Sequence, residues 1–93
     1  FKESDHDFES AELNKEHWAL VEQMNGEEVK ELIHALPEPE RMVFVLYEWE
    51  GYLHKEIAEK LACSERSSKR YLHRAKELLK KELTHKQALK KVI

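Results

Sequence analysis

Hydrophobic residues recur three and four positions apart through most of this chain, and that spacing is typical of α-helices buried along one side. The first such pattern begins at Ser10, and its apolar positions are Leu13, Trp18, Val21 and Met24. Asn25 and Gly26 end it, because both residue types tolerate the left-handed conformation that closes many helices. Residues 1–9 lack the spacing and are mostly charged, so they predict a disordered linker.

Two further helices are predicted on either side of a break made by two prolines. The first spans residues 27–36, and its expected buried positions are Val29, Leu32, Ile33 and Leu36. Pro37 and Pro39 interrupt the chain and restart it, since proline is tolerated in a first helical turn but not inside a helix. The next helix spans 38–50 and ends at Gly51. It holds the most apolar stretch of the chain, so we expect it at the centre of the core; its apolar residues are Val43, Phe44, Leu46, Tyr47 and Trp49.

The last two predicted helices stand in a helix-turn-helix arrangement. A short helix at 54–61 buries Ile57, Ala58 and Leu61 and is followed by three connecting residues, 62–64. Ser64 is placed to be the N-cap of a long helix at 64–83, and the tail 84–93 either continues this helix or frays. No strand pattern or internal repeat occurs. The predicted fold class is therefore all-α, a compact helical bundle with a C-terminal helix-turn-helix.

The long helix has two distinct faces. At about 100° per residue, one stripe is expected to face the core, and it contains Ser68, Leu72, Ala75 and Leu79. The opposite side is basic. In a helix-turn-helix the second helix enters the major groove of DNA, where arginine binds guanine or phosphate, and serine and lysine suit the backbone. The candidate DNA-binding residues are therefore Arg66, Ser67, Lys69, Arg70, His73 and Arg74.

Charge is distributed unevenly along the chain. The net charge is −3, but residues 1–63 hold 6 basic against 16 acidic residues, whereas residues 64–93 hold 10 against 3. The first part is therefore expected to repel phosphates and the second to attract them. A charged helix face is often only a solvated one. A face that is almost entirely basic, beside an acidic remainder, nevertheless favours DNA binding.

Composition argues against several other classes of protein. No apolar run of about 18 residues is present, so we expect no membrane span. The single cysteine, Cys63, cannot form an internal disulfide, suits a cytoplasmic protein and is interpreted as a small packing residue. The six histidines lack the spacing of metal ligands and are expected on the surface. With only two glycines there is no phosphate-binding loop. We therefore expect no cofactor, no small-molecule substrate and no catalysis.

Three segments carry a family resemblance, and they comprise Leu36-Pro37 with Arg41, Val43, Phe44 and Leu46; Gly51 with Glu56-Ile57-Ala58 and Leu61; and Ser64, Ser67-Ser68-Lys69, Leu72, Arg74 and Ala75. Together, residues 32–83 resemble region 4 of bacterial RNA polymerase sigma factors, the extracytoplasmic-function class in particular. The resemblance implies binding to the −35 promoter element by a domain docked on core RNA polymerase, largely through the flap of the β subunit. It also makes an anti-sigma factor a candidate partner. The family's usual DNA-contacting positions correspond to Lys69, Arg70, His73 and Arg74, whereas Arg66 comes from the face calculation alone.

Four residues depart from the family's pattern. Leu53 stands where a serine or threonine N-cap is usual, and loss of such a cap typically costs about 1 kcal/mol and predicts a ragged helix start. Ala62 replaces a turn glycine, although alanine disfavours positive φ. Arg66 stands where glycine is frequent. Ser68 takes a position that is often aliphatic, which predicts a weaker core stripe.

The expected organisation is a linker and N-terminal helix at 1–25, a region-4-like helix-turn-helix domain at 26–84 and a basic tail at 85–93. Because the chain begins with Phe1, we expect it to be processed or cut from a longer protein. Two other functions remain open. One is the output domain of a response regulator, which has a similar helix-turn-helix; the other is a helical protein-interaction module that has lost DNA reading.

Overall fold

The computed structural model describes residue 13 and residues 15–92, and every element within these residues is a helix. In chain order the elements are α2 (Lys15–Gln23), α3 (Gly26–His34), α4 (Glu38–Phe44), the π-helical segment η1 (Val45–Trp49), α5 (His54–Leu61) and α6 (Glu65–Val92). The all-α prediction is confirmed. The linker predicted at 1–9 and the helix start predicted at Ser10 lie outside the described residues.

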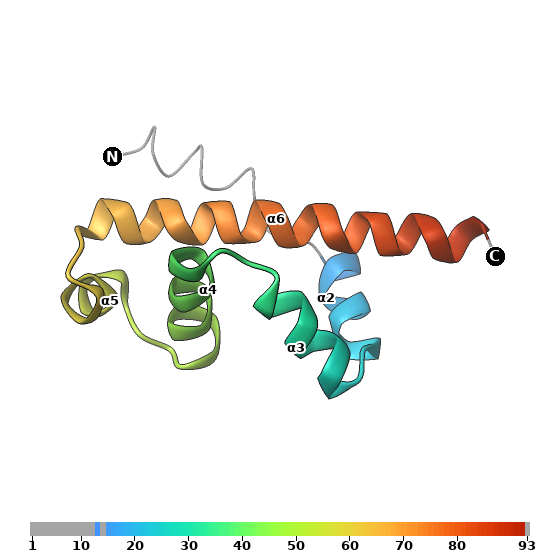
Figure 1. Ribbon diagram of the computed structural model, residues 1–93, viewed down its shortest axis with the longest axis horizontal. Coiled ribbons are helices and arrows are strands. Elements are labelled where there is room, and N and C mark those ends of the chain that lie inside the picture. Colours follow the sequence, from blue (N-terminus) through green and yellow to red (C-terminus); the bar gives the residue numbers. More distant parts are fainter. Residues whose placement is uncertain (1–12, 14, 93) are drawn as a thin grey trace.

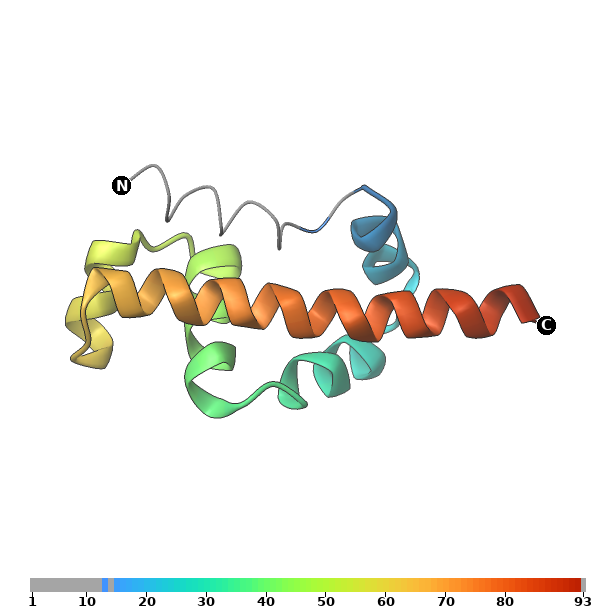
Figure 2. The ribbon, with the colours of Figure 1, turned by 90° about the horizontal axis from the view of Figure 1, so that it is seen from above.

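The longest element, α6, is the one against which the shorter helices pack (Figure 1). Its 28 residues correspond to roughly 42 Å of helix at 1.5 Å per residue, close to the 45 Å long axis of the molecule. In the perpendicular view α2 and α3 lie on opposite sides of it (Figure 2). The helix continues unbroken through the tail as far as Val92. Despite this length, neither α6 nor any other helix among the described residues is apolar enough to cross a membrane.

The core lies where α6 meets α3, α4 and α5. The inward stripe predicted for the long helix is confirmed, since none of its four side chains, those of Ser68, Leu72, Ala75 and Leu79, is more than 7 % exposed. The buried apolar residues form one cluster, which comprises Leu13, Leu32, Ile33, Leu36, Val43, Phe44, Ile57, Leu72, Ala75, Leu79 and Leu83. A single core thus joins the helix-turn-helix to the helices that precede it.

The third predicted helix is α-helical only as far as Phe44. Val43 and Phe44 are buried as expected, but the next five residues form a π-helix, closed by a 3.1 Å bond from the Glu50 N–H to the Val45 carbonyl. Because a π turn holds an extra residue, the side chains that follow are rotated relative to an α-helical stripe. Trp49 is 55 % exposed. The expectation that it lies in the core is therefore wrong.

The break between α2 and α3 falls where predicted, but for a different reason. Asn25 has φ −80° and ψ 171°, an extended conformation, and among the described residues only Gly51 and Ala62 have positive φ. Asn25 Oδ1 accepts from the Glu28 N–H at 2.9 Å, and Glu28 Oε1 accepts from the Asn25 N–H at 3.0 Å. This reciprocal capping box starts α3. The interpretation of Asn25 and Gly26 as a left-handed stop for α2 was wrong.

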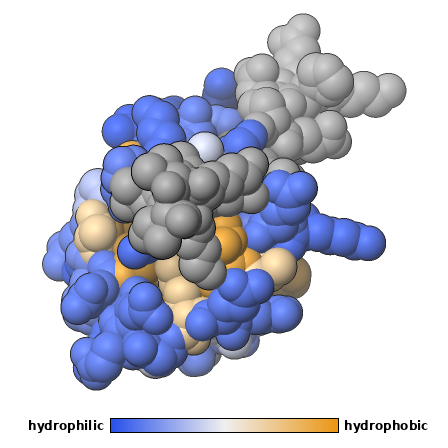
Figure 3. Space-filling model, turned by 90° about the vertical axis from the view of Figure 1, so that its right-hand side faces the viewer, coloured by the Kyte–Doolittle hydropathy of each residue, from blue (hydrophilic) through white to orange (hydrophobic). Residues whose placement is uncertain are grey.

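The N-terminal helix α2 packs against the distal part of α6. His17 is 5 % exposed, and its Nε2 lies 3.4 Å from Thr84 Oγ1. Trp18 packs half-buried against the core. The expectation that the histidines lie on the surface is therefore wrong for His17, because a contact across 67 positions leaves no mark in local spacing. Viewed from this end of the molecule, apolar surface lies between hydrophilic side chains (Figure 3).

Candidate nucleic-acid interface

The turn between α5 and α6 adopts a left-handed conformation at Ala62. Its φ is 55° and its ψ is 47°, and the following Cys63 N–H donates to the Ala58 carbonyl at 2.9 Å. A left-handed alanine costs roughly 1–2 kcal/mol because its Cβ approaches the carbonyl oxygen. The turn therefore keeps the backbone conformation that a glycine would adopt, at some cost in stability.

The first motif helix, α5, begins at His54 as predicted, without the ragged start that the missing cap suggested. Leucine has no acceptor, so the Leu53 side chain cannot bond the N–H groups of the first turn. Glu56 supplies the reciprocal half of a capping box, since its Oε1 accepts from the Leu53 N–H at 2.8 Å. This bond holds the entry to α5 although the usual cap is absent.

The polar residue in the core stripe of α6 has a specific partner in α5. Ser68 is 0 % exposed, and its Oγ lies 2.8 Å from His54 Nδ1. The His54 ring stacks on Tyr47 at 4.5 Å between centroids. Burial, with the nearby Lys69 as the next cause, lowers the pKa of His54 below 6.5. His54 is half-buried, which again departs from the expectation of surface histidines.

The second motif helix begins with the cap expected from the sequence. Ser64 Oγ accepts from the Ser67 N–H at 3.0 Å and donates to Ser67 Oγ at 3.0 Å. This bond satisfies one of the N–H groups that the first turn leaves without a helical partner. Ser67, a predicted backbone-contacting residue, thus has its hydroxyl engaged in the cap and is half-buried. The predicted N-cap is confirmed.

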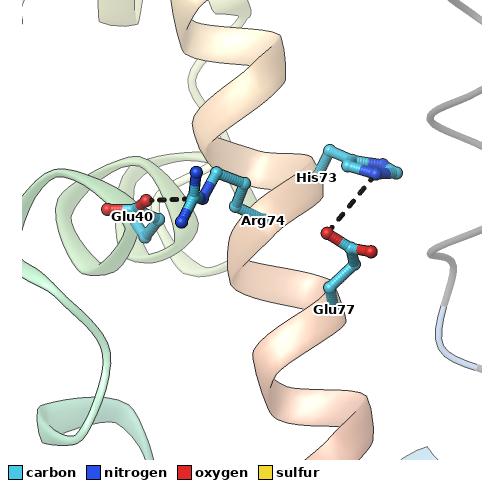
Figure 4. A network of polar contacts seen from close by, with 4 residues as sticks. All are labelled: Glu40, His73, Arg74 and Glu77. Carbon is cyan, nitrogen blue, oxygen red and sulfur yellow. Dashed lines mark ion pairs between the residues drawn. The ribbon is translucent and has the colours of Figure 1, made fainter.

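The predicted DNA-binding residues lie along one side of α6 but differ in their surroundings. Arg66 and Arg70 are exposed, and Lys69 is half-buried. The side chain of His73 is 18 % exposed, and its Nε2 lies 3.6 Å from Glu77 Oε1. Arg74 is more exposed, at 61 % of its side chain, but its Nε lies 3.2 Å from Oε2 of the buried Glu40 (Figure 4). On the basic side of α6, Arg66 and Arg70 are therefore exposed, whereas Arg74 contacts a buried carboxylate of α4, a contact that the sequence pattern did not predict.

One cation of the basic helix is buried altogether. The Lys76 side chain is 8 % exposed, and its Nζ lies 3.1 Å from Glu48 Oε2 in η1. A buried ammonium group requires such a partner because its desolvation is costly. The sequence holds a signal for this placement: Lys76 falls about 40° from Leu72 around the helix at 100° per residue. The charge pattern alone nevertheless includes Lys76 among the basic residues of 64–93 that are expected to attract phosphates.

A second surface feature lies between α3 and the α4–η1 segment. It is an open groove of about 530 Å³, and it is lined by Gly26, Val29, Lys30, Ile33, His34, Arg41, Met42, Val45, Leu46 and Trp49. Two of these apolar side chains are unusually exposed, Met42 at 41 % and Trp49 at 55 %. Exposed large apolar side chains in one groove are typical of a protein contact rather than of a DNA contact.

The cysteine and histidine positions offer no metal centre within the described part of the chain. No three His, Cys, Asp or Glu side chains there stand close enough to hold an ion. Cys63 is half-buried with a thiol outside any disulfide. The chemistry that the domain presents is therefore that of exposed guanidinium groups on one helix end and an apolar groove elsewhere.

A helix-turn-helix whose second helix exposes arginines at its N-terminal end defines a class of DNA-binding domains. A family model described as Sigma-70, region 4 matches residues 26–79, more than half of the 93 residues. The chain therefore belongs to the sigma-70 region 4 family, as the resemblance predicted. This family comprises promoter-recognition domains of sigma factors, which are DNA-binding regulators and not enzymes. No curated protein and no solved structure matches the chain.

Proposed function

We propose that this domain binds the −35 promoter element through the first turns of α6 while attached to core RNA polymerase, largely through the flap of the β subunit. One observation carries the DNA part of the proposal. Arg66 and Arg70 are exposed at the N-terminal end of the second motif helix, the part of a helix-turn-helix that meets base edges. No ion pair engages either of them within the described residues.

The DNA contacts that we assign to the side chains follow from their hydrogen-bond donors. Arg66 and Arg70 suit guanine, because a guanidinium group bonds its O6 and N7 together. Ser67 and Lys69 suit the sugar-phosphate backbone. His73 and Arg74 lie further along α6, where we expect phosphate contacts. We further propose that the domain belongs to an extracytoplasmic-function sigma factor acting in the bacterial cytoplasm, the class that residues 32–83 resemble in sequence.

The apolar groove supports the polymerase part of the proposal. The groove is formed by α3, α4 and η1, whereas the arginines proposed to read DNA belong to α6. DNA and RNA polymerase would therefore contact different residues. Exposed tryptophan and methionine are enriched in protein interfaces, and Trp49 and Met42 lie in this groove. An anti-sigma factor remains a further candidate partner that no feature of the described residues specifies.

The alternative of a helical protein-interaction module also draws support from this groove and from the engagement of Arg74 by Glu40. Family membership favours the sigma factor over the output domain of a response regulator. DNA binding distinguishes the sigma factor domain from the protein-interaction module, because a module that has lost DNA reading retains the groove but has no affinity for DNA.

The DNA part is tested by titrating the chain into a duplex at several salt concentrations. We expect salt-dependent binding, and Lys69→Ala, which removes a proposed phosphate contact, is expected to lower the slope of log K against log salt by about one unit. Lys15→Ala, which removes an exposed cation from α2, is the matched control and should leave the slope unchanged. No salt-dependent binding at low ionic strength would contradict the proposal.

The polymerase part is tested with an isolated β-flap fragment. Trp49→Ala is expected to weaken flap binding at least tenfold, in line with truncation of an aromatic hot spot. Leu53→Ala is the matched control, because Leu53 is 65 % exposed but does not line the groove. Equal losses from both variants would place the flap contact elsewhere on the domain.

A further inference from the structure

Glu40 lies on the inner side of α4 and faces α6. Its side chain is 7 % exposed, and its Oε2 lies 3.2 Å from Arg74 Nε. Its other oxygen, Oε1, is buried and has no hydrogen-bond partner within the described part of the protein. Arg74 is thus the only ion-pair partner of this carboxylate among the described residues, and the contact uses one edge of the guanidinium group (Figure 4).

The contact with Glu40 involves one of the three guanidinium nitrogens of Arg74. A guanidinium group carries five N–H donors in a rigid plane, and the Glu40 contact involves Nε. The Arg74 side chain is still 61 % exposed. It lies eight positions after Arg66 and four after Arg70 on the same helix. Most of the Arg74 side chain therefore remains exposed while its Nε contacts Glu40.

We infer that Glu40 is a positioning residue that holds Arg74 in the geometry with which it contacts a DNA phosphate. This inference rests on the proposed DNA-binding function. A competing role, in which Arg74 leaves Glu40 to reach DNA, would strand a buried carboxylate without compensation. A retained pair avoids that cost. It also reduces the side-chain entropy lost on binding, because one edge of a rotamer-rich side chain is already fixed.

Two substitutions of Glu40 separate positioning from simple charge. Removing any carboxylate near DNA strengthens binding by reducing repulsion. Glu40→Gln and Glu40→Met remove the same charge and keep a long side chain at a buried site. Only the glutamine retains an oxygen that can accept from Arg74 Nε. The ratio of their DNA affinities therefore reports the polar contact with Arg74 and not the charge.

The experiment titrates the full 93-residue chain against a labelled random-sequence duplex at low ionic strength, with thermal unfolding recorded for each variant. We expect Glu40→Gln to bind about three- to tenfold more tightly than Glu40→Met, the ratio that corresponds to ordering one rotamer-rich side chain. In an Arg74→Ala background the two variants should bind equally. Glu38→Gln, at an exposed position on the same helix, controls for the loss of charge and should bind as the wild type does or more tightly.

The outcomes distinguish failure of the inference from failure of the function. Equal affinities of Glu40→Gln and Glu40→Met overturn the positioning role, and so does a ratio that persists without Arg74. If Glu40→Met is unfolded at the assay temperature, Glu40→Leu takes its place in the same ratio. If the wild-type chain does not bind the duplex at any salt concentration, the proposed function falls and the inference falls with it. Loss of binding in Arg70→Ala, with no difference between the Glu40 variants, overturns the inference alone.

Discussion

Two stretches of α6 use their cations differently. In the first two turns Arg66 and Arg70 are exposed, and no carboxylate pairs with them in the described part of the chain. In the third and fourth turns Glu40 of α4 contacts Arg74, and Glu48 of η1 contacts Lys76. Between Arg66 and Lys76 the helix therefore shows a gradation, from exposed cations, through one shared with Glu40, to one that is buried.

The difference shows that the number of cations on a helix overstates how many of them are exposed and unpaired. The acidic part of the sequence also has a structural role, because two of its carboxylates pair with cations of the basic helix. Both pairs join α6 to the segment 38–49 and so mark where that segment lies on the long helix. Variants on the two stretches should therefore affect different properties of the domain.

The largest effect is expected from the exposed pair. Arg66→Ala combined with Arg70→Ala should weaken duplex binding by about 2–6 kcal/mol, since each arginine contact is worth roughly 1–3 kcal/mol. The free energy of unfolding should change by less than about 0.5 kcal/mol, as for other exposed sites. Fluorescence anisotropy with a labelled duplex and urea denaturation measure the two quantities. A loss of affinity below threefold would mean that the exposed arginines of the first two turns do not contribute more to DNA binding than the paired cations that follow.

The next effect concerns stability. Arg74→Ala should lower the free energy of unfolding by about 1–2 kcal/mol, because it leaves the buried Glu40 carboxylate without its partner; the estimate is reduced for the exposure of Arg74 to solvent. Arg70→Ala, four residues earlier on the same helix, is the control and should have almost no effect on stability. Urea denaturation checks both. Equal stabilities would mean that the ion pair contributes nothing to the fold.

A smaller loss of stability is expected on acidification, at His54 of α5, which contacts Ser68 in the first stretch of α6. The folded state favours neutral His54, because burial and then Lys69 lower its pKa, partly opposed by Glu65. Its contribution to stability is therefore complete above pH 6.5, the ordinary histidine value, and is lost as the pH falls through the lowered folded pKa. The free energy of unfolding should decrease between about pH 7 and pH 5.

Glutamine at position 54 provides the comparison, since it can bond Ser68 but does not titrate. The profile of His54→Gln should be flatter than that of the wild type, whereas His34→Gln, at an exposed position, should retain the wild-type slope. A His54→Gln profile that is as steep as the wild type would assign the acid sensitivity to other groups.

The smallest effect is expected where the cation is buried. Lys76→Met combined with Glu48→Gln keeps the net charge and replaces the inner ion pair, an exchange that is often close to neutral. The salt slope of DNA binding should stay within about 0.3 units of wild type, against about one unit for a phosphate contact. A slope reduced by a full unit would show that Lys76 reaches DNA, and would abolish the proposed gradation.

Much of the helical plan was predictable, because it depends on neighbours in sequence. The spacing of apolar residues placed α5 at the observed bounds and identified the stripe of α6. Ser64 was recognisable as a cap, since capping involves residues three positions apart. The same local reasoning failed at Asn25, because asparagine is common both at the end of one helix and as the N-cap of the next. It also failed at η1, where the α-helical period stops.

By itself, the sequence determined the all-helical class, the family and the buried stripe of α6, because periodicity, caps and turn residues act over a few positions. Only the tertiary structure decided which cations remain available. Glu40 and Arg74, Glu48 and Lys76, and His54 and Ser68 meet through the packing of separate helices. A helical period defines which side of a helix is buried but not which residue of another helix faces it. These pairings therefore depend on the arrangement of the helices in space.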